Sequence, residues 1–167
     1  MFQKSLELIK IKALMIKINV ITNNINWLSY IKNPKSYITR KIKKINKKSD
    51  EFINNKIICT LLLSGNREIK NLNKKFRKKN KITDILSFPF YKKKELKKKL
   101  KKEKEIYLGD IIININKIEI KKKDIFKLEF NKLWIHGFVH LFGFEHKKEK
   151  DYNKMNKIEK KYLSYLY

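Results

Sequence analysis

The sequence predicts a single α/β domain, or α+β in the looser sense, with a mixed sheet of about four strands packed with helices. Three observations predict it. Short β-branched apolar segments alternate with stretches whose apolar residues recur every three to four positions. The chain has 167 residues, 42% of them apolar, which suits one domain with one core. No internal repeat divides it, so we expect one domain over residues 1–167.

The N-terminal half predicts two strands and a broken helix. Residues 15–20, MIKINV, alternate apolar and polar side chains and predict the first strand. The preceding residues 1–14 form either a short helix or an irregular leader. Residues 26–47 place apolar side chains at helical spacing, with a break near Pro34. Residues 56–63, KIICTLLL, are apolar and rich in β-branched residues, which predicts a buried strand.

The middle of the chain predicts a helix, two strands and a lysine-rich segment. Residues 67–75 carry apolar side chains at helical intervals. Residues 84–90, DILSFPF, predict a strand stopped by proline, which suits a sheet edge. Residues 106–114 predict another strand, and the glycine inside it indicates a bulge or a close backbone approach. We expect the low-complexity residues 92–105 to form a solvated loop or a frayed helix, with a phosphate-tracking arm as the functional alternative.

Two helices complete the domain. Asp124 can cap a helix over residues 125–142, and Gly143 is suited to ending it. Residues 149–165 predict an amphipathic last helix. Four aromatic residues in the helix over residues 125–142 and in the turn after it follow helical spacing. This spacing predicts core positions and not base-stacking platforms. These residues are Trp134, Phe138, Phe142 and Phe144.

The charge of the chain is strongly positive. Lysine and arginine number 43 against 16 acidic residues, for a formal net charge of +27, and only three of the basic residues are arginine. Such an excess favours a polyanion, nucleic acid above all. A drift in base composition would produce the same flood of Lys, Ile and Asn. The sequence leaves both explanations open.

The sequence also indicates a compartment. A single cysteine, Cys59, excludes an internal disulfide framework and is expected to be a small core residue in a reducing compartment. The longest apolar runs fall far short of the ~20 residues that a bilayer requires. The N-terminus has no unbroken apolar region of signal-peptide length. We therefore expect a cytoplasmic protein with no membrane partner.

All three histidines lie within eleven residues: His136, His140 and His146. A spacing of four places the first two on one helix face, and the turn at Gly143 can bring the third imidazole towards them. Three imidazoles leave one tetrahedral position open, which is the ligand count of a catalytic zinc site. We therefore predict one zinc ion per chain on this helix in the C-terminal half.

Gly137, directly after the first histidine, bears on the type of metal site. Zinc peptidases of the metzincin class have the same histidine spacing but carry a glutamate there as general base. Without that carboxylate, a metallopeptidase or other metallohydrolase remains only an alternative. A glycine inside a helix costs about 1 kcal/mol relative to alanine. It therefore indicates that another group approaches the helix backbone closely.

The histidine segment, HGFVHLFGFEH, resembles the signature of the YbeY family, the bacterial rRNA maturation endoribonucleases: H-G-x-x-H-L-x-G-x-D-H. Residues 72–90, LNKKFRKKNKITDILSFPF, and the stretch LGDIIIN are similar to two further motifs of that family, and the pair Met155 and Glu159 also fits. The resemblance spans residues 15–163. It implies a single-strand-specific, zinc-dependent endoribonuclease for small-subunit rRNA 3′-end processing and ribosome quality control. It also implies a monomer that acts on ribosomal RNA or the ribosome and not on DNA.

The resemblance also implies roles for residues. The three histidines become the zinc ligands, and Arg77 and His136 become catalytic, with Arg77 clamping a phosphate. Glu145 stands where the family has Asp and is a candidate to orient a ligand. Asp84 and Asp110 could orient histidines or activate water, or simply cap turns, and both readings stay open. A non-catalytic ribosome assembly factor with a structural zinc is the remaining hypothesis.

Overall fold

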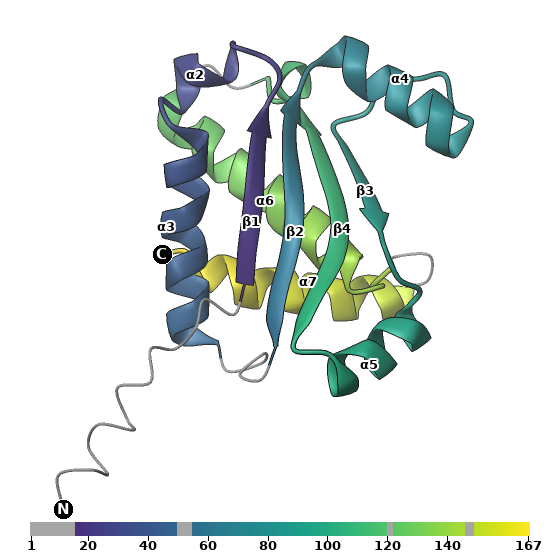
Figure 1. Ribbon diagram of the computed structural model, residues 1–167. Coiled ribbons are helices and arrows are strands. Elements are labelled where there is room, and N and C mark those ends of the chain that lie inside the picture. The colour runs from purple at the N-terminus through teal and green to yellow at the C-terminus, as the bar shows by residue number, and fades with distance from the viewer. Residues whose placement is uncertain (1–15, 50–54, 120–121, 146–148) are drawn as a thin grey trace, which may run out of the picture.

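The computed structural model describes residues 16–49, 55–119, 122–145 and 149–167. The leader expected over residues 1–14 lies outside these ranges. Four strands form one mixed sheet in the order β1-β2-β4-β3 (Figure 1). Strands β1, β2 and β4 run parallel, and β3 pairs antiparallel with β4 at the sheet edge. The strands are β1 Ile16–Thr22, β2 Lys56–Ser64, β3 Ile85–Pro89 and β4 Glu105–Asn114.

The α/β prediction is confirmed, including the break near Pro34, which begins the second helix of its segment. The helices are α2 Trp27–Tyr30, α3 Pro34–Lys48, α4 Asn66–Arg77, α5 Lys93–Lys102, α6 Lys123–Leu141 and α7 Glu149–Tyr165, with a 3-10 turn η1 at Ile115–Lys117. Among the described helices, none combines the length and apolar character that a bilayer crossing requires.

Two layers of unequal size enclose the sheet. Helices α3, α6 and α7 cover one face, which lies behind the sheet in Figure 1, and α4 covers part of the other. The larger core lies under α3, α6 and α7 and includes Cys59, whose burial raises the pKa of its thiol. Trp134 and Phe138 are fully buried there, and Phe142 and Phe144 pack against it, so the predicted core positions are confirmed. A small second core lies under α4.

Gly109 produces the predicted bulge in β4. Ile58 of β2 pairs with Tyr107 and Cys59 pairs with Gly109, so Leu108 is the extra residue. Gly109 has φ +132°, and a Cβ there would lie 2.1 Å from the carbonyl oxygen of Phe88 in β3. Only glycine combines this φ with such a close approach of the neighbouring backbone.

One expectation was wrong, and one pair of alternatives is now decided. Residues 92–105, expected to form a solvated loop or a frayed helix, contain helix α5, because Leu96 is buried and Leu100, four residues later, packs on the same core. The lysines occupy the solvated side of that helix. Asp124 does not cap α6, because the helix begins at Lys123 and Lys122 occupies the cap position. Asp124 lies in the first turn instead, where a carboxylate complements the helix dipole.

Candidate functional site

Helix α6 lies directly on the sheet at Gly137. A Cβ at this position would lie 2.7 Å from Cγ2 of Ile111 in β4 and 2.9 Å from Cδ1 of Ile85 in β3. The close approach expected from this glycine is therefore confirmed. It holds the adjacent turn of α6, with His136 and His140, next to the edge strand β3.

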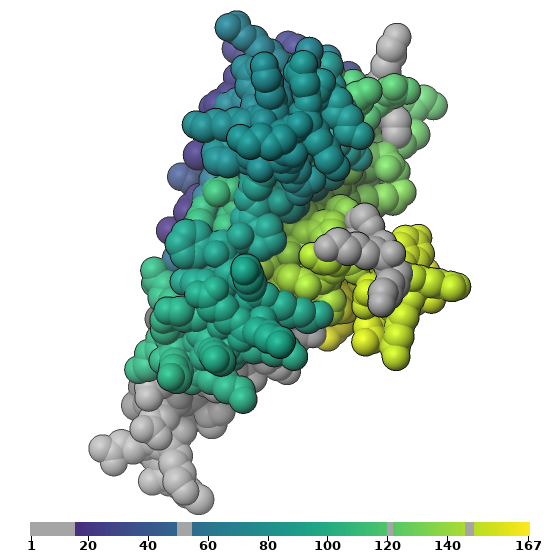
Figure 2. Space-filling view, turned by 90° about the vertical axis from the view of Figure 1, so that its right-hand side faces the viewer, coloured from purple at the N-terminus to yellow at the C-terminus, as the bar shows by residue number. Residues whose placement is uncertain are grey.

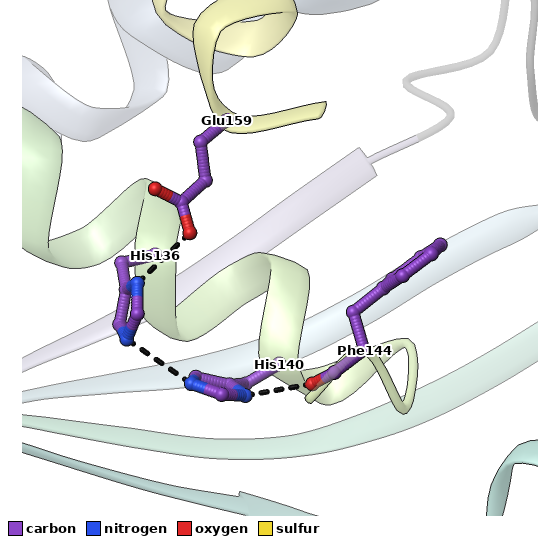
Figure 3. Close-up of polar contacts among 4 residues, drawn as sticks. All are labelled: His136, His140, Phe144 and Glu159. Carbon is purple, nitrogen blue, oxygen red and sulfur yellow. Dashed lines mark hydrogen bonds and ion pairs between the residues drawn. The ribbon is translucent and has the colours of Figure 1, made fainter. Parts of the chain in front are cut away.

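The two imidazoles turn the same nitrogen towards each other, as Figure 3 shows. The Nε2 atoms of His136 and His140 lie 3.0 Å apart, and the rings are nearly perpendicular, at 88°. The prediction that a spacing of four places both rings on one face is confirmed.

The second nitrogen of each ring has a partner. His140 Nδ1 lies 2.7 Å from the carbonyl oxygen of Phe144, which can only accept, so this nitrogen carries the proton. His136 Nδ1 lies 2.9 Å from Oε1 of Glu159 in α7 and donates to that carboxylate. In their neutral forms, both rings therefore present Nε2 lone pairs to each other (Figure 3).

This arrangement suits a cation. Two lone pairs 3.0 Å apart repel unless a proton or a metal ion lies between them. Nitrogen ligands at 2.0–2.1 Å from a tetrahedral zinc ion are separated by about 3.3–3.4 Å, close to the distance between the two rings. Imidazoles that donate their other N–H to a carboxylate and a backbone carbonyl are also typical of zinc ligands.

The third predicted ligand, His146, lies outside the described residues. Within the described residues, no group of three or more His, Cys, Asp or Glu side chains could hold a metal ion. Gly143 ends α6 as predicted, with φ +76° and its N–H donating to the His140 carbonyl oxygen over 2.8 Å. The same turn brings the Phe144 carbonyl to His140. The three-histidine ligand set stays a prediction.

A cavity of about 710 Å³ opens beside the two histidines. It is bounded by the edge strand β3, the second half of α6, the turn after it and α7. Figure 2 shows this side of the molecule, with α4 and α5 on one side of the hollow and α7 on the other.

Arg77 lines the same cavity, although it lies 59 residues before His136. It is the last residue of α4, and its Nη2 donates to the carbonyl oxygen of Ser87 in β3 over 3.0 Å. Its Cζ lies 5.6 Å from the ring centre of Phe88. These two contacts fix the guanidinium at the rim. Two residues that the sequence predicted to be catalytic are thus brought to one cavity.

The three acidic candidates differ in position. Asp84 lines the cavity but is exposed, and its Oδ1 accepts from Thr83 Oγ1 and the Ile85 N–H. It therefore caps the start of β3. Glu145 lines the cavity beside the Gly143 turn, and its suggested action on a ligand stays a prediction.

Asp110 is not a partner of the histidines. Its neighbour Ile111 points at α6, so Asp110 points to the opposite face of the sheet. There its Oδ1 accepts from the Tyr107 hydroxyl over 2.6 Å. Burial, followed by this hydrogen bond, raises the pKa of Tyr107 to about 12. Of the readings left open for Asp110, the structure excludes the one in which it orients a histidine, because strand alternation turns it away from α6.

Glu159 is the site residue to which the sequence assigned no role. Met155, Glu159 and Tyr162 lie on one face of α7, and Met155 and Tyr162 are buried. A carboxylate between two buried positions of an amphipathic helix was the available signal. Such a carboxylate requires a partner, which the sequence does not identify.

Comparisons with known proteins agree with the geometry. The family model described as Endoribonuclease YbeY matches residues 21–167. A protein of that name from Pelagibacter ubique is 46% identical over 149 residues, covering 87% of this chain and 92% of the relative. The Endoribonuclease YbeY of Thermodesulfovibrio yellowstonii is 34% identical over 76% of each chain. The solution structure of TM1509 from Thermotoga maritima has the same fold, with a TM-score of 0.53 at 23% identity, covering 91% of this chain and 89% of that chain.

Proposed function

The chain belongs to the YbeY family of endoribonucleases, and on that basis we propose that it cleaves single-stranded segments of ribosomal RNA in a zinc-dependent reaction. We place this activity in the 3′-end maturation of small-subunit rRNA and in ribosome quality control, in the cytoplasm. The chain acts as a monomer on RNA or the ribosome, and not on DNA or a membrane. One observation carries the proposal: two Nε2 atoms 3.0 Å apart face the cavity that Arg77 also lines.

His136 and His140 would hold one zinc ion through Nε2, together with His146 from the segment after the turn. When bound, the ion supplies Lewis-acid chemistry that stabilises negative charge developing on phosphate oxygens. Glu159 and the Phe144 carbonyl keep the Nδ1 protons in place, so that both Nε2 lone pairs stay available.

Arg77 would bind the phosphate next to the bond that is cleaved. A guanidinium has five N–H donors in one plane, and the contact with Ser87 uses one nitrogen to hold that plane at the rim. The remaining donors can hold two phosphate oxygens at once, which a lysine ammonium does less well.

The peptidase alternative loses support at Gly137. The space where a side chain at this position would begin is filled by Ile111 and Ile85. A carboxylate there would have to displace the sheet. The cavity thus lacks a general base at the position where the metzincin pattern carries one.

A cleavage assay on small-subunit rRNA tests the proposal. Wild type, His140→Ala, Arg77→Lys and Asp124→Asn are stripped with a chelator and then given zinc. We expect His140→Ala to lose both zinc and cleavage. Arg77→Lys should keep zinc and cleave at least about tenfold more slowly, through loss of the two-point phosphate contact. Asp124→Asn, at an exposed position in the first turn of α6 and outside the cavity lining, is the matched control and should behave as wild type.

Two results would contradict the proposal. Cleavage that survives complete removal of the metal would exclude the zinc-dependent reaction. RNA binding by the wild type without any metal-dependent cleavage would indicate an assembly factor with a structural zinc.

A further inference from the structure

The face of the sheet opposite α6 carries a row of aromatic side chains near β3. In Figure 1 this face lies towards the viewer, and below α4 no described helix covers it. We call the row the aromatic strip and define it as Phe76, Phe88, Phe90 and Tyr107.

The strip consists of two pairs of neighbouring rings. The ring centres of Phe76 and Phe88 lie 5.4 Å apart, and those of Phe90 and Tyr107 lie 6.0 Å apart. The two halves meet at Asp110, which pairs across the sheet with Phe88 and accepts the Tyr107 hydroxyl. The two pairs of rings therefore lie on the same outer face of the sheet, at β3 and β4.

Two members of the strip are unusually exposed. Phe76 is 57% exposed and Phe90 is 65% exposed, whereas Trp27, Trp134 and Phe138 are fully buried. Each exposed ring forgoes part of the roughly 1.5–3 kcal/mol that full burial of a phenylalanine contributes. Apolar rings left exposed on one face of a molecule are typical of a binding surface.

The charge around the strip favours a polyanion. Residues 70–83 contain seven basic side chains and no acidic one. Lys75 Nζ lies 5.3 Å from the ring centre of Phe76, and Arg77 lies over Phe88. Exposed rings interleaved with cations are the combination that binds single-stranded nucleic acid, because every base has a face that stacks.

The strip continues into the cavity through β3. Ile85, Ser87 and Pro89 line the cavity, whereas Phe88 and Phe90 alternate with them and belong to the strip. Arg77 contacts both sides, since it lines the cavity and lies over Phe88. A single-stranded nucleic acid with one phosphate at Arg77 can therefore cross β3 and place its neighbouring bases on the rings.

The edge of β3 disfavours a peptide as the occupant. A peptide would join this sheet by pairing with the free edge of its last strand. Pro89 has no N–H to offer, and the Ser87 carbonyl already accepts from Arg77. The edge is thus blunted for strand addition, while the rings beside it remain open.

We propose that the aromatic strip is a base-stacking platform for the single-stranded RNA that flanks the bond to be cleaved. This inference rests on the proposed function for its account of how the substrate reaches the cavity. The stacking itself requires no metal, so it can be measured separately from cleavage.

The test measures binding of a fluorescently labelled oligouridine of about 12 nucleotides to the full chain. Fluorescence anisotropy detects the binding, and a chelator is present throughout. We expect Phe76→Ala and Phe90→Ala each to weaken binding by about tenfold, because each removes one stacking surface. Phe90→Tyr keeps a ring and should stay within about twofold of wild type. Leu128→Ala, which removes a 42% exposed side chain on α6 outside the strip, is the matched control and should leave binding unchanged.

A second readout places the base on the ring. In Phe90→Trp the new indole should be exposed, whereas Trp27 and Trp134 are fully buried. Oligouridine should quench this emission, and iodide should no longer reach the indole in the complex. Circular dichroism melts of each variant show whether it has folded.

Two outcomes overturn the inference, and a third separates it from the proposed function. Binding by the folded double variant Phe76→Ala/Phe90→Ala within twofold of wild type would exclude a stacking role. Unchanged RNA binding together with lost binding to an isolated ribosomal protein would make the strip a protein-docking surface. If wild type binds oligouridine through the strip but never cleaves RNA with zinc restored, the proposed function fails while the stacking platform stands.

Discussion

Glu159 decides which nitrogen of His136 faces the cavity. An imidazole has two nitrogens and one proton when neutral, and the hydrogen bond at one nitrogen fixes the state of the other. The carboxylate holds the proton at Nδ1 and leaves Nε2 as the donor to a cation. His140 reaches the same state through the backbone carbonyl of Phe144, which stays in place when the Phe144 side chain is substituted. His136 is therefore the ligand whose orientation depends on a distant side chain.

We predict that Glu159→Gln weakens zinc binding by about 10- to 100-fold. The amide keeps an acceptor but loses the charge, and it can rotate to present its NH₂ group to the ring. Competition with a chromophoric chelator measures the affinity, and nitrogen NMR of the metal-free protein reports the tautomer of His136. Glu105→Gln, in an exposed ion pair with Lys56 far from the site, is the control. Equal zinc affinities for Glu159→Gln and wild type would remove the positioning role.

At the scale of elements, the strands and most helices could be predicted because their signals are local. The alternation of apolar and polar residues predicted β1. The proline predicted that β3 lies at a sheet edge, and the glycine predicted the bulge in β4. For α5 the sequence did not decide between a loop and a helix, because lysines dominate its pattern and only the packing of Leu96 on the core selects the helix. Asp84 and Asp110 have similar sequence surroundings, but only the sheet decides which face each one occupies.

Gly137 joins α6 to the sheet, and we predict that Gly137→Ala destabilises the protein by about 1–3 kcal/mol. In an ordinary helix interior the same change would stabilise by about 1 kcal/mol, so the sign of the effect is diagnostic. The added methyl would lie 2.7 Å from Ile111 and 2.9 Å from Ile85, which must move. Urea unfolding measures the free energy. Lys123→Ala, at the exposed start of α6, should change it by less than about 0.5 kcal/mol. A stabilised Gly137→Ala variant would contradict the close contact.

At the scale of the whole molecule, the chain has a net charge of +27. Its core is held together by polar groups as well as apolar ones. Buried Asn131 accepts from the Tyr37 hydroxyl and the Trp134 indole, and it donates to Tyr167 at the C-terminus. Burial raises the pKa of Tyr37 to about 12. The fold therefore holds this phenol in its neutral form.

This burial predicts a pH dependence. Unfolded tyrosine ionises near pH 10, whereas folded Tyr37 and Tyr107 keep their protons to about pH 12. Above pH 10 the folded state binds more protons than the unfolded state, so their contribution to stability is complete below pH 10 and is lost as pH rises towards 12. Urea unfolding between pH 9 and 12 should show a shallower fall for Tyr37→Phe/Tyr107→Phe than for wild type. Tyr152→Phe, at an exposed position, should follow wild type, and identical slopes for all three would contradict the prediction.

The sequence by itself determined the succession of strands and most helices along the chain, the pairing of His136 with His140, and the motifs that identify the family. These features depend on spacing along a few turns or on short runs of residues, and such spacing is visible in the chain. The tertiary structure alone decided that Glu159 holds His136, that Asp110 faces away from the site, and that four separate aromatic residues form one strip. The physical reason is that these contacts join segments far apart in the chain, and only the packing of helices on the sheet brings such segments together.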